Sequence, residues 1–366
     1  MSEWKEYKLG EVINLKRGYD LPNAERKSGN YPIVSSSGIT DYHSSFMKQP
    51  PGVVTGRYGT IGKLFYINEP YWPLNTTLYV TDFKGNDPKF IYYFLQSFDF
   101  EKFNDKSTVP GINRNDVHTE VVNIPEFNEQ TAIAEVLSSL DDKIDLLHRQ
   151  NKTLEQLAET LFRQWFVEEA EESWEEKTIS QIIEVRDGTH DSPKQTDQGK
   201  YLITSKHLKP TGIDFETAYR ISGQDFIEVN RRSKVDKDDI LFSMIGTLGL
   251  IHYVNNEPEF AIKNIGLFKS SQKPRFAKFL FLLLKSPLGL KFIHENATGS
   301  TQEYITLGNL RDFEFSYPGD SLIEEFDDEV DPIFQKIKSN TTQIKTLTQL
   351  RDTLLPKLMS GEVRVK

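Results

Sequence analysis

Residues 133–165 read IAEVLSSLDDKIDLLHRQNKTLEQLAETLFRQW, and this stretch decides the fold. Its apolar residues, with one asparagine among them, recur in alternating steps of four and three. The positions are Ile133, Leu137, Leu140, Ile144, Leu147, Asn151, Leu154, Ala158, Leu161 and Trp165. This unbroken heptad spacing is typical of a helix that lies along another helix. The alternative is an ordinary amphipathic helix packed on the core of its own domain.

A second copy of the same pattern follows 193 residues later in the chain. Its positions are Phe326, Val330, Ile333, Ile337, Asn340, Ile344, Leu347, Arg351, Leu354 and Leu358. The letters agree as well as the spacing, since KTLEQLAETL at 152–161 returns as KTLTQLRDTL at 345–354. The chain therefore carries two copies of one long helix, and we expect them to pair as an internal coiled coil.

Antiparallel pairing of the two helices is the favoured geometry. Parallel pairing would require the domain between them to carry the chain back over the full helix length, about 50 Å for 33 residues at roughly 1.5 Å each. Antiparallel pairing relates the two halves by a pseudo-twofold axis and places Asn151 and Asn340 on either side of the midpoint. A buried polar residue can fix helix register; alternatively, one or both asparagines face solvent.

The segments beside the helices are also repeated. Residues 1–127 predict a mixed α/β domain with a hairpin around the glycine turn GRYGTIG at 56–62, and DDILFSMIGTLG at 238–249 repeats this hairpin. The segments 201–214 and 223–237 have no close counterpart in the first half. One scaffold with different loops is expected when a fold carries two binding specificities.

The predicted fold class is α/β (α+β), with two similar globular domains separated by two long antiparallel helices that form a coiled coil. The expected boundaries are a first domain at 1–127, a first helix at 128–170, a second domain at 171–320, and a second helix with a C-terminal tail at 321–366.

The ends of the two helices are predicted from capping residues. Asn128 is the expected N-cap of the first helix, which ends near Phe166. Ser321 is a candidate cap for the second helix, but Pro332 lies inside its pattern. The second helix either kinks at Pro332 or begins there, and a start at Pro332 is slightly favoured. The segment 354–358 is expected to stop it.

Charge and composition bound the function. The net charge is −10, but residues 1–127 hold 14 basic and 15 acidic side chains and residues 173–320 hold 19 and 20, so the deficit lies mainly at 128–172. On charge alone a protein-binding module is favoured, because DNA binding would need basic partners. The chain has no cysteine, and neither a membrane-length apolar run nor a signal region is seen. A reducing cytoplasm is therefore expected, with no membrane association.

The search for catalytic motifs finds none. The glycine turn at 56–62 has five residues between its outer glycines, and Leu64 follows Lys63, whereas a phosphate loop needs four and then Ser or Thr after the lysine. Histidines are scattered without ligand spacing at His43, His118, His148, His190, His207, His252 and His294. We expect a non-catalytic protein with no metal and no cofactor; a nucleotide-binding enzyme that uses the turn is the weakest alternative.

Three stretches together resemble a known family. They are GRYGTIGKLFYINEPYWPLNTTLYV at 56–80, LFRQWFVEEAE at 161–171 and LLPKLMSGEVRV at 354–365. With the paired helices between variable domains, the chain resembles the specificity subunits of type I restriction–modification systems. The resemblance implies one domain for each half of a bipartite double-stranded DNA target, and helices that act as a ruler and dock two methyltransferase subunits. It also implies motor–endonuclease subunits in the full complex. The second domain carries IKNIGLF at 262–268 instead of the NTTLYV wording.

Candidate DNA contacts are polar or basic residues on the predicted loops, since these side chains hydrogen-bond base edges. They are Ser35, Ser36, Ser37, Arg57, Tyr58, Thr60, Thr108 and Arg114 in the first domain, and Ser205, Lys206, His207, Arg231, Arg232, Thr247, Ser300 and Gln302 in the second. The competing hypothesis is a non-DNA coiled-coil adaptor whose twin domains bind other ligands, which the net charge motivates.

Overall fold

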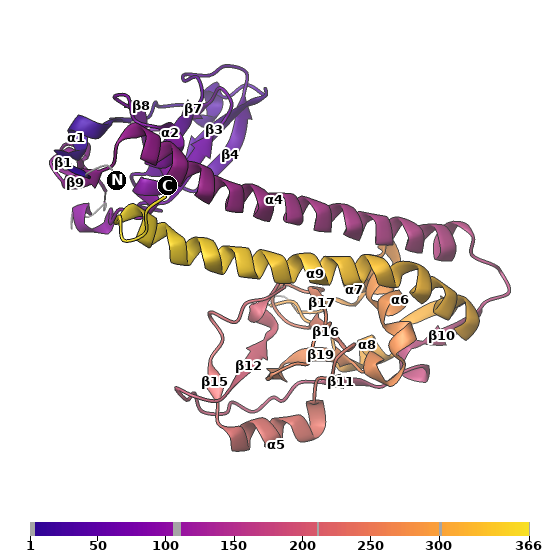
Figure 1. Ribbon diagram of the computed structural model, residues 1–366. Helices are drawn as coiled ribbons and strands as arrows, with labels where there is room; N and C mark the ends of the chain where they lie inside the picture. The colour runs from indigo at the N-terminus through magenta and orange to yellow at the C-terminus, as the bar shows by residue number, and fades with distance from the viewer. Residues whose placement is uncertain (1–3, 105–110, 211, 300–301, 366) are drawn as a thin grey trace. The chain divides into compact units, whose positions relative to one another are not determined.

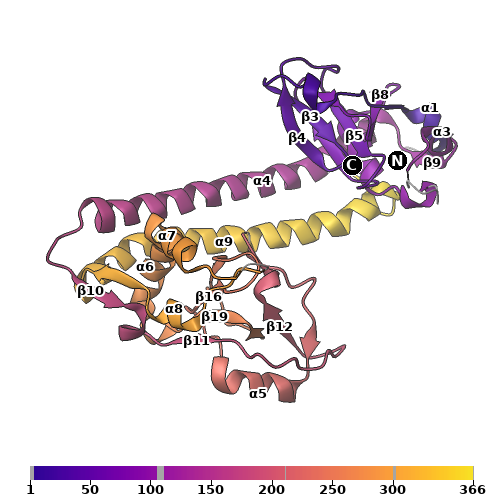
Figure 2. The same ribbon diagram turned by 180° about the vertical axis from the view of Figure 1, so that it is seen from behind.

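The computed structural model describes residues 4–104, 111–210, 212–299 and 302–365. The chain divides into two compact units, the first made of 1–148 with 342–366 and the second of 149–341. Two long helices, α4 (Phe127–Arg163) and α9 (Asp320–Met359), each contribute one half to each unit. Figures 1 and 2 show the elements from opposite sides.

The first unit is built from short strands and helices that precede α4. In chain order these are β1 (Lys5–Lys8), α1 (Leu9–Val12), β2 (Asn14–Arg17), β3 (Tyr31–Ser35), β4 (Gly38–His43), β5 (Gly52–Gly56), β6 (Leu64–Ile67), β7 (Trp72–Pro73), β8 (Thr77–Asp82), α2 (Pro88–Gln96), α3 (Arg114–His118) and β9 (Val121–Ile124).

The second unit lies in the chain between α4 and α9. Its elements are β10 (Glu175–Thr178), β11 (Val185–Asp187), β12 (Lys200–Thr204), β13 (Leu208–Lys209), β14 (Gly212–Ile213), β15 (Arg220–Ile221), α5 (Gly223–Ser233), β16 (Ile240–Ser243), β17 (Ile251–Tyr253), β18 (Phe260–Lys263), β19 (Ile265–Phe268), α6 (Pro274–Lys285), α7 (Pro287–Asn296), α8 (Leu307–Arg311) and β20 (Glu314–Tyr317).

Both units build the same three sheets, which confirms the internal repeat. The first unit has the strand orders β1-β9, β2-β8-β5-β6 and β4-β3-β7, and the second has β10-β20, β11-β19-β16-β17 and β15-β12-β18. β3 pairs with β7 in parallel, and its counterpart β12 pairs with β18 in parallel. The second unit adds the β13–β14 hairpin and the helix α5, which falls in the segment 223–237 that has no counterpart in the first half.

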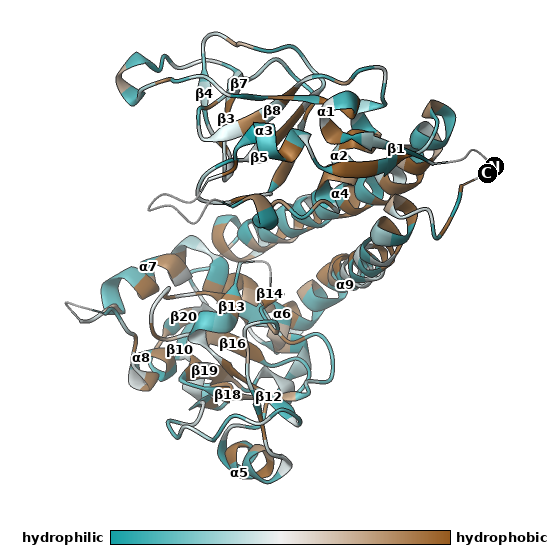
Figure 3. Ribbon diagram, turned by 90° about the vertical axis from the view of Figure 1, so that its left-hand side faces the viewer, coloured by the Kyte–Doolittle hydropathy of each residue, from teal (hydrophilic) through white to brown (hydrophobic). Residues whose placement is uncertain are grey.

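In each unit one helix joins the four-stranded sheet to the long-helix pair. In the first unit, Phe90 and Tyr93 of α2 share a core with Ile133 and Leu137 of α4 and Leu358 of α9. The counterpart helix α6 packs in the same way on the second unit's helix pair. Hydrophobic residues gather on the strands of its sheets (Figure 3), and all residues of β16 and β19 are buried.

The long helices are antiparallel within each unit, as predicted. In the first unit, Arg351 Nη1 of α9 lies 2.9 Å from Asp141 Oδ1 of α4, and Arg364 beyond α9 pairs with Glu129 near the start of α4. In the second unit, Asn340 Nδ2 donates to Asn151 Oδ1 at 2.9 Å. Partner numbers therefore fall along α9 as they rise along α4, and every residue of the predicted heptad seam is buried or half-buried.

The expected helix ends need three corrections. The helix α4 begins at Phe127, with the carbonyl of Glu126 accepting from the N–H of Glu129 at 3.0 Å, so Asn128 is not its cap. The helix α9 begins at Asp320 and runs unbroken through Pro332, so the favoured start at Pro332 is wrong. It also continues to Met359 instead of stopping across 354–358.

Packing explains why α9 tolerates Pro332. A proline costs a helix one N–H donor and a steric clash. Here Val330 and Ile333 are both buried, so the helix surface beside the proline is held by the core. Lys278 of α6 also bridges Asp327 at 2.7 Å and Asp331 at 3.0 Å. Tertiary contacts thus outweigh the local preference. No helix of the described residues is both long and apolar enough to cross a membrane.

Candidate nucleic-acid interface

Three loops of the first unit meet at one end of its four-stranded sheet. The N–H of Arg57, in the glycine turn, donates to the carbonyl of Thr76 at 2.9 Å, and the N–H of Ile112 donates to the carbonyl of Arg57 at 3.1 Å. The N–H of Ser36 reaches Thr76 Oγ1 at 3.4 Å. These bonds bring Ser36 and Arg57, two of the predicted contacts, beside the loop that leads to Arg114.

The second unit repeats these backbone bonds with different side chains. The N–H of Ile305 donates to the carbonyl of Met244 at 3.0 Å, which makes Met244 the counterpart of Arg57. The N–H of Asn264 donates to the carbonyl of Thr189 at 3.2 Å, as the N–H of Asn75 does to that of Tyr19 at 3.0 Å. Each unit therefore has the same loop framework but carries different side chains on it.

In the first unit these loops surround a basic depression, which we call the Arg57 depression. Its lining is Lys16, Arg17, Gly18, Tyr19, Asp20, Arg57, Leu78, Asn113 and Arg114. Four of these side chains are cations and one is a carboxylate, so the local charge is strongly positive although the chain is acidic. Asp20 lies 3.6 Å from Arg17 Nη2, and both are largely exposed. Such a surface attracts a polyanion.

Arg57 is the most constrained cation of this depression. Its guanidinium carbon lies 4.4 Å from the centroid of the Tyr58 ring, and its Nε donates to the carbonyl of Ile112 at 3.2 Å. Gly111 packs against the same ring, since a Cβ added there would lie 2.2 Å from Tyr58 Cε1. The stack and the hydrogen bond together fix the direction of the guanidinium.

A tyrosine pair begins at the wall of this depression, where Tyr19 is a lining residue. The hydroxyls of Tyr19 and Tyr79 share a hydrogen bond of 2.9 Å, and Lys48 Nζ lies 5.3 Å from the Tyr79 ring centroid. The hydrogen bond with Tyr79 lowers the pKa of Tyr19, and the nearby Lys48 and Lys16 act in the same direction against burial. Burial raises the pKa of Tyr79. The pair thus places a shared hydroxyl–hydroxyl hydrogen bond next to the cations.

At the corresponding place the second unit has a continuous polar chain. Arg232 Nη2 of α5 lies 2.5 Å from Asp187 Oδ1, and Asp187 Oδ2 lies 2.9 Å from His190 Nε2. His190 Nδ1 lies 2.8 Å from Asn264 Oδ1, and Ser205 Oγ donates to the carbonyl of Asn264 at 2.8 Å. The chain links α5 to the loop after β12, so Ser205 and Arg232 are brought into one network.

The other predicted contacts are placed as follows. Ser35 and Ser37 share a hydroxyl–hydroxyl hydrogen bond of 2.9 Å in the turn after β3. Arg231 of α5 is exposed and lies 2.8 Å from Glu228. The remaining exposed candidates are Thr60, Lys206, Thr247 and Gln302. Thr108 and Ser300 lie outside the described residues.

His207 requires a correction. Its side chain is fully buried, and its Nδ1 accepts the N–H of Thr204 at 2.9 Å. Burial lowers the pKa of His207. The ring is therefore a capping element of the turn after β12 and presents no surface to a ligand.

Sequence reasoning missed Lys16, Arg17 and Tyr19 in the first unit and Asp187 and His190 in the second. All five lie within two residues of Gly18 or Gly188, which are equivalent glycines. A Cβ would lie 2.1 Å from the carbonyl oxygen of Leu74 in the first unit and 2.7 Å from that of Ile262 in the second. Aligning Gly18 with Gly188 when the two halves of the sequence were compared would have singled out the residues on either side of each glycine. Among the described residues, no group of three His, Asp or Glu side chains is arranged to hold a metal.

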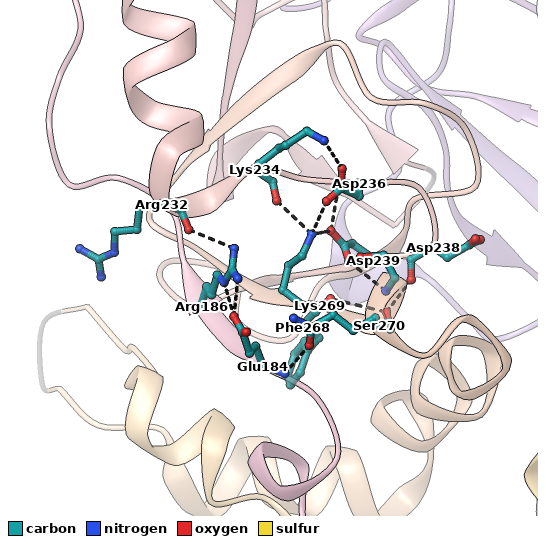
Figure 4. Close-up of polar contacts among 12 residues, drawn as sticks. Glu184, Arg186, Arg232, Lys234, Asp236, Asp238, Asp239, Phe268, Lys269 and Ser270 are labelled. Atoms are coloured by element: carbon teal, nitrogen blue, oxygen red, sulfur yellow. Dashed lines mark hydrogen bonds and ion pairs between the residues drawn. The ribbon is translucent and has the colours of Figure 1, made fainter. Parts of the chain in front are cut away.

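A buried ionic network fastens the segment after α5 to the core of the second unit (Figure 4). Lys269 Nζ, with a side chain 5% exposed, lies 2.5 Å from Asp239 Oδ2 and 2.7 Å from Asp236 Oδ2. It also donates to the carbonyl of Lys234, the C-cap residue that follows α5, at 3.1 Å. Although burial acts to raise it, the pKa of Asp236 is lowered by the hydrogen bonds from Lys234 and Lys269.

Comparison with known proteins matches this architecture to one family. The chain matches the family described as the type I restriction modification DNA specificity domain over residues 1–156 and again over 171–349. The chain belongs to this family. The family model therefore matches each copy of the repeated domain once.

Individual relatives carry the same description. The MjaIX specificity subunit of Methanocaldococcus jannaschii is 27% identical over 304 residues, which cover 76% of this chain and 69% of that protein. The HindI specificity subunit of Haemophilus influenzae is 23% identical over 470 aligned positions, which cover 99% of this chain and all of that protein. The crystal structure of a type I S subunit from M. genitalium has a TM-score of 0.67 at 19% identity and covers 98% of this chain and 96% of that one, so it shares the fold.

Proposed function

We propose that this chain is the DNA sequence-specificity subunit of a type I restriction–modification complex, and that each unit recognises one part of a bipartite double-stranded target. The observation that carries the proposal is the pair of units with identical sheet order and different side chains on equivalent loops. A cation set surrounds Arg57 in the first unit, and the Arg232–Asp187–His190 chain replaces it in the second. Twin scaffolds with different loops suit two different half-sites.

The proposed partners follow from family membership. Two methyltransferase subunits dock on the long helices, which act as a ruler between the half-sites, and motor–endonuclease subunits complete the full complex. Methyl transfer, ATP hydrolysis and cleavage belong to these partners, and the chain itself acts without catalysis. Basic partner subunits would also offset the acidic charge of α4. The absence of cysteine suits the reducing cytoplasm, where such a complex would work.

Methylation profiling tests the proposal. The chain is co-expressed with its cognate methyltransferase, and modified adenines are mapped by modification-sensitive sequencing. One split motif that depends on this chain is the expected result, and an unsplit motif or no dependence on the chain would refute it. Replacing residues 1–127 with the equivalent domain of another specificity subunit should change only one half of the motif.

The adaptor hypothesis makes a different prediction. If the twin domains bind ligands other than DNA, the assembled complex will show no DNA binding even at low salt. The proposed function predicts binding whose logarithm falls linearly with the logarithm of salt concentration. The cations of the Arg57 depression favour salt-dependent DNA binding, as the proposed function predicts.

A further inference from the structure

We infer that the Arg57 depression divides DNA binding between two kinds of group: Arg57 reads a guanine in the first unit's half-site, while Lys16, Arg17 and Arg114 neutralise phosphates. The inference rests on the proposed function and adds a role for each cation. Base contacts carry sequence information, whereas phosphate contacts set affinity and salt dependence. The two roles therefore have separate experimental signatures.

Arg57 has the constraint that base reading requires. The stack on Tyr58 and the Nε bond to Ile112 hold the guanidinium, so little side-chain entropy is lost on binding. Within the described ranges, no protein oxygen accepts a hydrogen bond from its Nη atoms. Two Nη donors in a fixed fork match the O6 and N7 acceptors that guanine presents in the major groove, which makes guanine the expected base.

The three other cations have the opposite character. Lys16 and Arg114 are exposed, and no carboxylate of the described residues forms an ion pair with either one. Among the acidic residues that the structure describes, Arg17 pairs with Asp20 alone, at 3.6 Å. Both side chains are more than half exposed, so the pair is weak. Long, exposed cations suit contact with the phosphates that flank a base, where charge matters more than direction.

The second unit serves as an internal control for a structural role. The backbone bond that Arg57 makes with Ile112 is made there by Met244 with Ile305, so the scaffold accepts an uncharged residue at this position. In the first unit, Arg17 of β2 pairs with Leu78 of β8, and in the second unit Asp187 of β11 pairs with Gly266 of β19. The second unit therefore has a carboxylate where the first has the cation Arg17. The fold therefore does not need the charges of Arg57 and Arg17, although Lys16 has a cationic counterpart in Arg186. A ligand accounts for the gathering of four cations around one depression.

The first experiment tests base reading by Arg57. The assembled methyltransferase complex with Arg57→Gln is profiled for methylation, and its motif is compared with that of the parent and of Lys63→Gln. Lys63 is the matched control because it belongs to the same hairpin but its Nζ faces the Phe65 ring at 5.4 Å. Arg57→Gln should relax one guanine position in the first half of the motif and leave the second half unchanged, while Lys63→Gln keeps both halves.

A binding assay covers the case in which Arg57→Gln abolishes methylation. Duplexes carry 7-deazaguanine, which lacks the N7 acceptor, at each guanine of the first half-site in turn. The parent complex should lose roughly 5- to 150-fold in affinity at one position, and Arg57→Gln should lose almost nothing further there. The guanine assignment would be overturned by a first half-site that contains no guanine, or by an Arg57→Gln complex whose methylation motif is unchanged. It would also be overturned if 7-deazaguanine reduced the DNA affinity of the parent and of Arg57→Gln by the same factor.

The second experiment tests the phosphate role. The double variant Lys16→Gln/Arg114→Gln should reduce the slope of log affinity against log salt by about 2, since each phosphate contact contributes about 0.9, and should keep the motif. Lys5→Gln/Lys8→Gln removes the same charge from the exposed strand β1 and should leave the slope unchanged. Equal slopes for the two double variants would refute the phosphate assignment. A parent complex with no split motif would instead refute the proposed function.

Discussion

Lys269→Met is expected to destabilise the second unit by removing the cation of a buried network. Asp239 is fully buried and Lys269 is 4% exposed, with Nζ 2.5 Å from Asp239 Oδ2. The substitution leaves the Asp239 carboxylate with two backbone donors, the N–H of Asp236 at 2.7 Å and the N–H of Ser271 at 3.1 Å, but with no countercharge. These two hydrogen bonds offset only part of the cost of burying a charged carboxylate without a cation.

The expected loss follows from this burial. Removing one partner of a buried ion pair costs about 3–5 kcal/mol in the free energy of unfolding, a large part of the 5–15 kcal/mol typical of a domain. Adding Asp239→Asn to Lys269→Met should recover most of the loss. The amide is neutral, and its single oxygen still accepts from one of the two backbone N–H groups, which now donate to different carboxylate oxygens. The other N–H loses its acceptor, so the double variant should lie about 1–3 kcal/mol below the parent.

Urea unfolding read by tryptophan fluorescence measures these values. The second unit contains Trp165 and Trp174, so a Trp4→Phe/Trp72→Phe background reports on that unit alone. Lys234→Met is the matched control.

Lys234 Nζ lies 2.5 Å from Asp236 Oδ1, but its side chain is 64% exposed, so Lys234→Met should cost less than about 1 kcal/mol. A Lys269→Met protein within 1 kcal/mol of the parent, or a double variant no more stable than the single one, would refute the reasoning.

Three further predictions concern other sites. Burial lowers the pKa of His252 to about 4. The stability that comes from keeping this imidazole neutral is fully present above its unfolded pKa of about 6.5 and is lost as pH falls toward 4. At pH 5 the free energy of unfolding should have dropped by at most about 2 kcal/mol, and His252→Asn should flatten this pH profile. Asn151→Leu should cost about 1–3 kcal/mol because it leaves the fully buried Asn340 amide without its 2.9 Å partner, whereas replacing both asparagines by leucine should be neutral or stabilising in the same urea assay. Gly111→Ala should displace the Tyr58 ring, weaken the stack on Arg57 and lower DNA affinity about two- to fivefold, with an unchanged thermal midpoint for the second unit as the control.

The heptad spacing predicted the helix pair because burial of an apolar stripe is a local property of sequence. The second copy at a shift of 193 then implied antiparallel pairing, and the Asn151–Asn340 hydrogen bond agrees with it. Local rules failed at Pro332. There the cost of a proline is outweighed by side chains from α6, such as Lys278, which are far away in sequence.

The candidate interface was predictable only in part. Arg57 was found because it stands in a glycine turn, a local feature. Lys16 precedes Arg57 by 41 residues and is brought beside it by the pairing of β2 with β8 and of β8 with β5. His207 shows the converse, since a polar residue on a predicted loop proved to be fully buried.

The sequence by itself determined the duplication, the two long helices and the family, because spacing and repeated words survive without coordinates. Tertiary structure alone decided which side chains share a surface. Strand register sets those neighbours, and register depends on contacts between residues far apart in the chain. For this protein it gathered Lys16, Arg17, Arg57 and Arg114 around one depression and placed Asp187, not a cation, at the equivalent position of the second unit.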